Sequence, residues 1–179
     1  MKLVVYGDFN CPYSALASVR LDRLLRDGTA EVEWRSVQHD AAMPPRGSPV
    51  DDELRCELER EITEICGLMQ GDEIVPLEIM ETRPNTAEVS RVFSTLDGEE
   101  AHFRRRDFFD AVWAQGRNVS DSTILGELGG EGSIPKRDVE WQAEWSGGEP
   151  RVVPRLVLAD GTVHGGVEAL EQLAAFAYG

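Results

Sequence analysis

The chain has 179 residues, 41% of them hydrophobic, which is enough apolar material for a substantial core. Its formal net charge of −15 creates a negative potential that repels nucleic-acid phosphates and anionic lipid headgroups. We therefore expect neither a nucleic acid nor a membrane as a partner. Because nothing in the composition indicates a second core or a disordered majority, we predict a single domain over residues 1–179.

The N-terminus and the cysteines predict a cytoplasmic protein. The apolar segment 3–6 is too short for the hydrophobic region of a signal peptide and precedes no small-residue cleavage site. No later apolar run approaches the roughly 20 residues that span a bilayer. In a reducing compartment the odd count of three cysteines predicts free thiols instead of a disulfide framework.

Residues 2–37 predict a β-α-β unit. Residues 2–6 form a short apolar run typical of a buried strand, and residues 14–26 carry apolar side chains at helical spacing. Gly28 ends that helix, and polar and apolar residues then alternate over 31–37, as in a second strand. Such an opening belongs to an α/β fold with a right-handed crossover.

The middle of the chain predicts a helical insertion, at about residues 48–146, and the end predicts a β-β-α unit. A turn-rich segment follows the second strand, and helical patterns continue to a Gly- and Pro-rich break near residue 148. Beyond it, two strands flank an Asp-Gly turn and a helix closes the chain. The predicted helices are 51–70, 86–97, 99–115, 121–128, 135–145 and 167–178, and the last strands are 155–159 and 162–164.

A cysteine lies where the first strand gives way to the first helix, in the segment Cys-Pro-Tyr-Ser. With Cys11 as the N-cap and Pro12 at the first helical position, the free amides of Tyr13 and Ser14 point toward the sulfur and the helix dipole favours a thiolate. The Ser14 hydroxyl can donate a further hydrogen bond. We therefore predict that the pKa of Cys11 lies below the usual value of about 8.5, and we assign catalytic roles to Cys11 and Ser14.

Serine at position 14 also removes the second thiol of a Cys-x-x-Cys pair, which would release a mixed disulfide by internal attack. The remaining cysteines, Cys56 and Cys66, fall on one predicted helix about 15 Å apart and cannot bridge each other. We interpret them as small apolar residues of a helix face. An external thiol is then needed for resolution.

A proline precedes the first strand of the β-β-α unit. On frequency alone Pro154 would follow a trans peptide bond, because only about 5–6% of such bonds in folded proteins are cis. Its context changes that expectation. A β-α-β unit with a cysteine at the first helix start, followed by Val153, Pro154, a strand, a turn, a strand and a helix, resembles the thioredoxin fold with its cis-proline loop beside the active thiol.

The inserted helices narrow the resemblance to the DsbA-like family, which includes the FrnE-type proteins, the 2-hydroxychromene-2-carboxylate isomerases and the kappa-class glutathione transferases. Five segments, which occur in the same order as in the family, support this resemblance: YGDFNCPYS, WRSVQHDAAMPPRG, RPNTAEVSRVF, FFDAVWAQGRNVSDSTIL and VVPRLVLADGTVHGG. The resemblance implies a thioredoxin fold with a large helical insertion. It also implies thiol-disulfide or glutathione-linked chemistry at Cys11, with Pro12, Tyr13, Val153 and Pro154 contacting the substrate.

Three functions remain open from the sequence. The first is a monothiol oxidoreductase acting on a disulfide-containing protein or a small thiol or disulfide, with glutathione or another low-molecular-weight thiol as co-substrate and no metal or tightly bound cofactor. The second is a glutathione-dependent transferase or isomerase of the kappa or 2-hydroxychromene-2-carboxylate isomerase type. The third is a noncatalytic peptide-binding or chaperone-like module.

Other polar residues have structural roles in this prediction. We expect Asn85 to cap a helix, and His39 and His102 to be surface residues that nothing positions near Cys11. Asp8 either accepts a proton or closes the turn before Cys11. The arginine run 104–106 is expected to be a solvated helix face paired with neighbouring acids.

Overall fold

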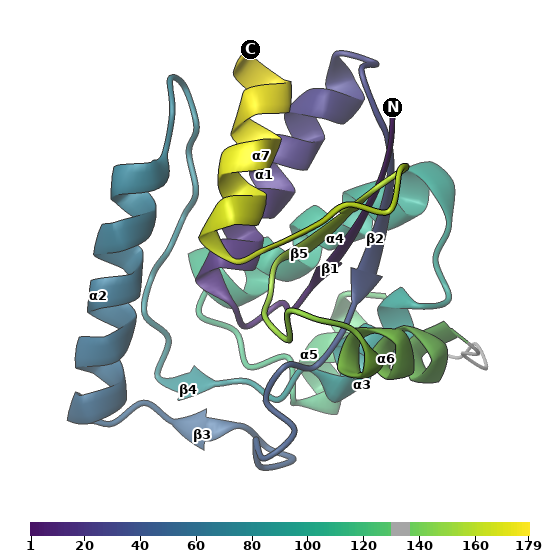
Figure 1. Ribbon diagram of the computed structural model, residues 1–179. Coiled ribbons are helices and arrows are strands. Elements are labelled where there is room, and N and C mark those ends of the chain that lie inside the picture. Colours follow the sequence, from purple (N-terminus) through teal and green to yellow (C-terminus); the bar gives the residue numbers. More distant parts are fainter. Residues whose placement is uncertain (130–136) are drawn as a thin grey trace.

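A computed structural model describes residues 1–129 and 137–179 (Figure 1). A four-stranded sheet with the order β2-β1-β5-β6 lies at its centre. β1 is parallel to β2 and antiparallel to β5, and β5 is antiparallel to β6. The strands are β1 (Lys2–Gly7), β2 (Glu31–Ser36), β5 (Arg155–Leu158) and β6 (Val163–Gly165), and the helices that connect and follow them are α1 (Pro12–Arg26) and α7 (Val167–Tyr178).

The predicted β-α-β and β-β-α units are both present. α1 joins the parallel pair β1 and β2, and it lies beside α7 on the same side of the sheet (Figure 1). β1 and β5 are the inner strands of the sheet, each with a hydrogen-bonded neighbour on both edges, and most residues of β1 are buried. The N-terminal and C-terminal parts of the chain therefore build the sheet together.

The chain between β2 and β5 is mainly helical, and its details differ from the prediction. Helix α3 ends at Phe93 instead of residue 97, and α4 passes into a π-helical turn after Phe109. The predicted helix 135–145 begins in residues that lie outside the described part. The elements are β3 (Ser48–Pro49), α2 (Asp52–Leu68), β4 (Thr82–Arg83), α3 (Ala87–Phe93), α4 (Gly98–Phe109), η1 (Asp110–Ala114), α5 (Ser122–Glu127) and α6 (Arg137–Gly147).

Strands β3 and β4 were not predicted. They pair antiparallel over two residues each, Ser48 with Arg83 and Pro49 with Thr82. Two residues are too few for an alternating pattern, so the sequence carries no periodic signal for them. Among the residues described, no helix combines the length and the apolar character of a membrane span.

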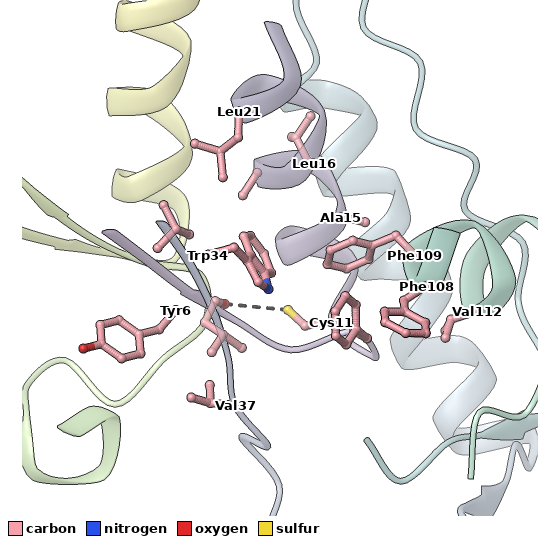
Figure 2. Packing of buried hydrophobic residues seen from close by; sticks show 14 of the residues in the cluster. Tyr6, Cys11, Ala15, Leu16, Leu21, Trp34, Val37, Phe108, Phe109 and Val112 are labelled. Atoms are coloured by element: carbon pink, nitrogen blue, oxygen red, sulfur yellow. Dashed lines mark hydrogen bonds between the residues drawn. The ribbon is translucent and has the colours of Figure 1, made fainter. Parts of the chain in front are cut away.

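An aromatic cluster joins the turn after β1 to the inserted helices. The ring of Phe9 packs edge-on against Phe93, Phe108 and Phe109, with centroid distances of 5.7, 5.3 and 5.0 Å. Trp34 of β2 also packs against Phe109, with the ring centroids 5.5 Å apart. Aromatic pairs of this geometry stabilise a fold by more than the burial of their surface alone. The turn that precedes Cys11 is therefore anchored in the core (Figure 2).

The arginine run on α4 corrects one expectation. Arg105 is fully buried, not solvated, and donates hydrogen bonds to Ser18 and Asp22 of α1. Arg104 and Arg106 lie nearer the surface, and Arg106 also approaches Asp22. The pairing with acids is as predicted, but the middle arginine lies between two packed helices because α4 crosses α1.

A second buried ion pair ties α1 to the segment after α2. Arg20 and Glu73 are each 1% exposed at the side chain, and Nε of the arginine lies 2.7 Å from the carboxylate. The remaining guanidinium nitrogens donate to the carbonyl oxygens of Leu170 and Leu68, at 2.7 and 2.6 Å. One side chain therefore links α1, α2 and α7.

Candidate active site

The thiol of Cys11 lies between the end of β1 and the loop before β5. Cys11 is the N-cap of α1, Pro12 occupies the first turn, and the residue is 6% exposed. Its Sγ donates a hydrogen bond to the carbonyl oxygen of Val153 at 3.7 Å (Figure 2). The Val153–Pro154 peptide is cis, and the amide of Gly166 donates to the carbonyl of Pro154 at 2.8 Å.

Cys11, near the N-terminus, and Val153, near the C-terminus, are thus in contact, as the sequence analysis predicted. Ser14 is fully buried, one helical turn after Cys11, and its hydroxyl accepts a hydrogen bond from the amide of Asp8 at 3.3 Å. The hydroxyl of Tyr13 donates to Glu64 of α2 at 2.6 Å, so the side chain of Tyr13 bridges the helix start and α2. Burial and the nearby Glu64 raise the pKa of Tyr13.

The prediction of a lowered thiol pKa is wrong for this structure. The pKa of Cys11 is raised to about 11, mainly by burial and to a smaller extent by the charge of Asp8. The Ser14 hydroxyl and the amides of Ser14 and Tyr13 do lower it, as the helix-start geometry predicts, but they do not outweigh the loss of solvent. The resting thiol is therefore protonated at neutral pH.

The inserted region holds the turn that carries Cys11. Trp113 donates its indole N–H to the carbonyl of Phe9 at 2.9 Å, and Asn10 donates its amide to the carbonyl of Pro84 at the same distance. Three successive residues of the turn are anchored in this way, since the hydroxyl of Thr86 donates to Asp8 at 2.6 Å. The position of the thiol consequently depends on the packing of the insertion against the sheet.

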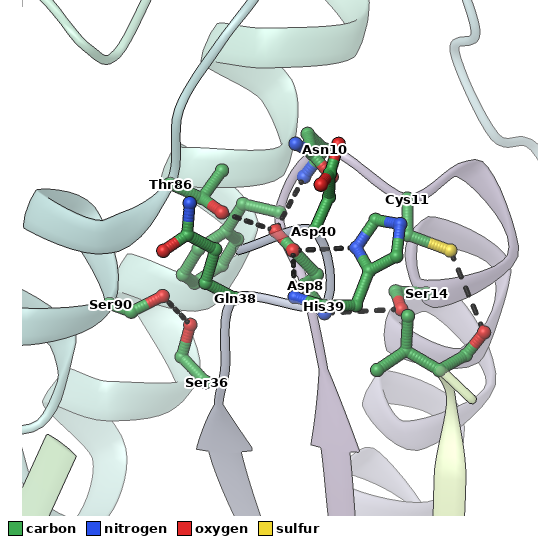
Figure 3. Close-up of polar contacts among 12 residues, drawn as sticks. Asp8, Asn10, Cys11, Ser14, Ser36, Gln38, His39, Asp40, Thr86 and Ser90 are labelled. Carbon is green, nitrogen blue, oxygen red and sulfur yellow. Dashed lines mark hydrogen bonds and ion pairs between the residues drawn. The ribbon is translucent and has the colours of Figure 1, made fainter. Parts of the chain in front are cut away.

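His39 is not the unattached surface residue that the sequence predicted. Its backbone amide and its ring Nδ1 both contact Oδ2 of the buried Asp8, at 2.9 and 2.7 Å (Figure 3). The register of the parallel strands explains this, because Gly7 and Ser36 are paired and the residues that follow them meet at one edge of the sheet. The sequence predicts both strands but not their register, so the contact could not be read from it.

The remaining candidates have simpler roles. The amide oxygen of Asn85 accepts a hydrogen bond from the amide of Ala87 at 2.9 Å, but the N-cap of α3 is Thr86, one residue after the predicted cap. Cys56 and Cys66 lie on α2 as free, exposed thiols, so they are not packed residues of a helix face. Within the described ranges, no group of three or more potential metal ligands is found.

A cavity of about 430 Å³ lies between the end of β2, α3 and α6. Its walls are mainly small or polar, and the hydroxyls of Ser36 and Ser90 contact each other at 2.7 Å beside it. Gln38, the neighbour of His39, exchanges two hydrogen bonds with Gln142 in its wall. A space of this size can hold a small molecule near the Asp8–His39 contact.

Fold and site together define a thioredoxin-fold protein with a cysteine at the start of its first helix and a cis-proline loop beside the thiol. The chain belongs to the family of the DSBA-like thioredoxin domain, whose family model matches residues 2–132. This confirms the resemblance seen in the sequence and the predicted fold, a thioredoxin fold with a large helical insertion.

Solved structures with the same fold have different recorded activities. A 2-hydroxychromene-2-carboxylate isomerase is 20% identical, with a TM-score of 0.69 over 98% of this chain and 93% of its own. A probable DsbA oxidoreductase from Streptomyces coelicolor is 17% identical, with a TM-score of 0.70 over 98% and 89%. The cytosolic disulfide reductase DsbM from Pseudomonas aeruginosa, solved with GSH, is 19% identical, with a TM-score of 0.55 over 99% and 96%.

These identities establish the fold and leave the reaction to be argued from the site. No curated protein sequence matches the chain.

Proposed function

We propose that this protein is a thiol-disulfide oxidoreductase that works with one thiol, Cys11. The carrying observation is the contact of Cys11 Sγ with the Val153 carbonyl, beside Pro154 and at the start of α1. A disulfide-containing substrate in extended conformation can pair with the backbone at Val153 and so bring its sulfur to Cys11. Pro12, Tyr13 and Pro154 then form the walls of the substrate site.

The reaction proceeds through a mixed disulfide. Cys11 Sγ attacks one substrate sulfur, the substrate S–S bond breaks, and the departing sulfur takes up the proton that Cys11 loses. An external thiol then attacks the mixed disulfide, which releases the substrate half and restores the Cys11 thiol. Ser14 supports the thiolate with its hydroxyl and offers no second sulfur for internal release.

The external thiol in this proposal is glutathione or another low-molecular-weight thiol. DsbM, a structural neighbour described as a cytosolic disulfide reductase, was solved with GSH, which supports this choice by analogy of fold. We place the reaction in the cytoplasm, where such thiols are abundant and where the three free cysteines would stay reduced. No metal or bound cofactor enters the scheme.

The test uses a Cys56→Ala, Cys66→Ala variant, in which Cys11 is the remaining thiol. We expect oxidised glutathione to add one glutathione to the folded protein, and added glutathione to remove it, as followed by intact mass. Cys11→Ser in the same background is the control and should gain nothing. A folded protein that stays unmodified while its urea-unfolded form is modified would contradict the proposal.

Ser14→Cys tests the single-thiol character separately. The two side chains would lie one helical turn apart at the helix start, within reach of a disulfide. We expect this variant to release a bound substrate half without external thiol and to end with a disulfide between Cys11 and the introduced thiol. Release that still required external thiol would show that the geometry at position 14 does not support resolution.

A noncatalytic peptide-binding module is favoured by one observation, the burial that raises the pKa of Cys11. In that case extended peptides would bind along Val153 with equal affinity in the wild type and in Cys11→Ala. A glutathione-dependent transferase or isomerase is favoured by the 430 Å³ cavity, whose lining includes Gln38, the neighbour of His39 in the chain. Stable binding of glutathione without disulfide turnover would support that alternative.

A further inference from the structure

The carboxylate of Asp8 is held by four hydrogen bonds although it is fully buried. Oδ1 accepts from the amide of Asn10 at 3.1 Å and from the hydroxyl of Thr86 at 2.6 Å. Oδ2 accepts from the amide of His39 at 2.9 Å and faces its Nδ1 at 2.7 Å (Figure 3). These contacts fix the carboxylate in place, and two of the four hydrogen bonds come from His39.

The contact decides which nitrogen of His39 carries a proton. Since a carboxylate accepts and does not donate, Nδ1 bears a hydrogen, and in the neutral ring Nε2 is the nitrogen with the free lone pair. The side chain is 27% exposed, so Nε2 is not sealed in the interior. Asp8 lies close to both groups, because it contacts the imidazole and its charge also acts on the Cys11 thiol (Figure 3).

Charged groups around the ring are mainly acidic. Asp8 faces Nδ1, and the half-buried Glu61 of α2 interacts electrostatically with both His39 and Arg83. The Asp8 carboxylate stabilises the imidazolium that forms when Nε2 accepts a proton.

We propose that His39, oriented by Asp8, is the acid-base group that takes the proton of Cys11 and returns it to the departing sulfur. This inference rests on the proposed function. As Cys11 Sγ forms a bond to a substrate sulfur, its proton passes to Nε2 of His39. As the substrate S–S bond breaks, the imidazolium gives that proton to the leaving thiolate, so the products are the Cys11 mixed disulfide and a neutral thiol.

In this mechanism the burial of the Cys11 thiol has a function. A protonated resting thiol is protected from adventitious oxidation, and the base activates it only when a disulfide lies against it. Asp8 acts through His39 and is a positioning residue, whereas His39 would touch the reacting proton.

The test compares two neutral disulfides with His39→Asn in the Cys56→Ala, Cys66→Ala background. Asparagine can still donate to Asp8 but has no base at the position of Nε2. An alkyl disulfide releases a basic thiolate that needs a proton, whereas dithiodipyridine releases a stable one that does not. We expect the variant to react about 10²-fold more slowly with 2-hydroxyethyl disulfide and to lose much less with dithiodipyridine.

His164→Asn is the matched control, because His164 also pairs through Nδ1 with a carboxylate, Glu168, at 3.0 Å. It should react like the parent with both reagents. No loss of His39→Asn with either disulfide would overturn the relay, and equal losses with both would overturn its second step, the return of the proton to the leaving sulfur. Both outcomes leave the proposed function intact. A parent protein whose folded Cys11 reacts with neither disulfide would overturn the proposed function, and the relay with it.

Discussion

The sulfur of Cys11 lies 3.7 Å from the carbonyl oxygen of Val153, a residue 142 positions further along the chain. The thiol donates to this oxygen only while it is protonated, because a thiolate has no hydrogen to give. The contact therefore belongs to the resting state that burial favours, and it is broken when the sulfur attacks a substrate. The same carbonyl marks the backbone with which an extended substrate would pair.

Alkylation of Cys11 should be slow at neutral pH. With a pKa of about 11, the folded thiol is about 0.01% ionised at pH 7, against a few per cent for an ordinary thiol. In the Cys56→Ala, Cys66→Ala variant we expect the iodoacetamide rate to lie about 10²-fold below that of the urea-unfolded protein. If the pH midpoint of the reaction of the folded protein lay below 8.5, the raised pKa would be contradicted. The lowered pKa predicted from the helix start would then be supported.

Stability should fall in the alkaline range because of the same thiol. Above the unfolded-state pKa of about 8.5 the unfolded chain has lost the proton of Cys11 while the folded protein keeps it, so stability decreases up to the folded value near 11. The loss amounts to about 3 kcal/mol at 1.36 kcal/mol per unit. Urea unfolding of the wild type and Cys11→Ala at pH 8 and pH 10.5 measures it.

Tyr6 and Tyr13 also have raised pKa values, so their ionisation in the unfolded chain near pH 10 lowers stability as well. The comparison therefore depends on the difference between the two proteins. Stability of the wild type should decrease more steeply with pH than that of Cys11→Ala. Parallel curves for the two proteins would mean that burial does not hold the thiol protonated.

The elements around Cys11 were predictable because each has a local signal. The strand 2–6, the helix start at Pro12 and the closing helix 167–178 follow from apolar spacing and from the position of proline. Their joining into one site followed from the family resemblance, which the family model over residues 2–132 now confirms.

The pKa of Cys11 and the role of His39 were not predictable in the same way. The helix start lowers the pKa, but how deeply the thiol is buried depends on how the loop at Val153 and the inserted helices cover it. His39 follows β2 in a turn-rich segment, and only the pairing of Gly7 with Ser36 brings it to Asp8. Both properties arise from tertiary contacts between distant segments.

Asp8→Asn should move two properties of the site in opposite directions. Removing the carboxylate charge lowers the pKa of Cys11, so iodoacetamide should react faster at pH 8. The new amide can donate to Nδ1 of His39, which places the ring hydrogen on Nε2 and removes the base, so exchange with 2-hydroxyethyl disulfide should slow. A merely structural role for Asp8 would change both rates in the same direction.

Asp40→Asn is the control for that variant, because Asp40 is close in sequence and its carboxylate accepts only from the amide of Ala42 among the contacts described. It should leave both rates within about twofold of the parent, as expected for a carboxylate outside the relay. Circular dichroism at the assay temperature checks that Asp8→Asn is folded, since losing buried hydrogen bonds costs about 1–3 kcal/mol each.

Glu73→Ala should be among the most destabilising substitutions outside the site. It leaves the guanidinium of Arg20, 1% exposed, without its buried counter-charge, which typically costs about 3–5 kcal/mol. Asp72→Ala removes the neighbouring carboxylate, which is 81% exposed and pairs with Arg23, so it should cost less than about 1 kcal/mol. Urea unfolding at pH 7 separates the two, and equal midpoints would mean that α1, α2 and α7 are not held together through Arg20.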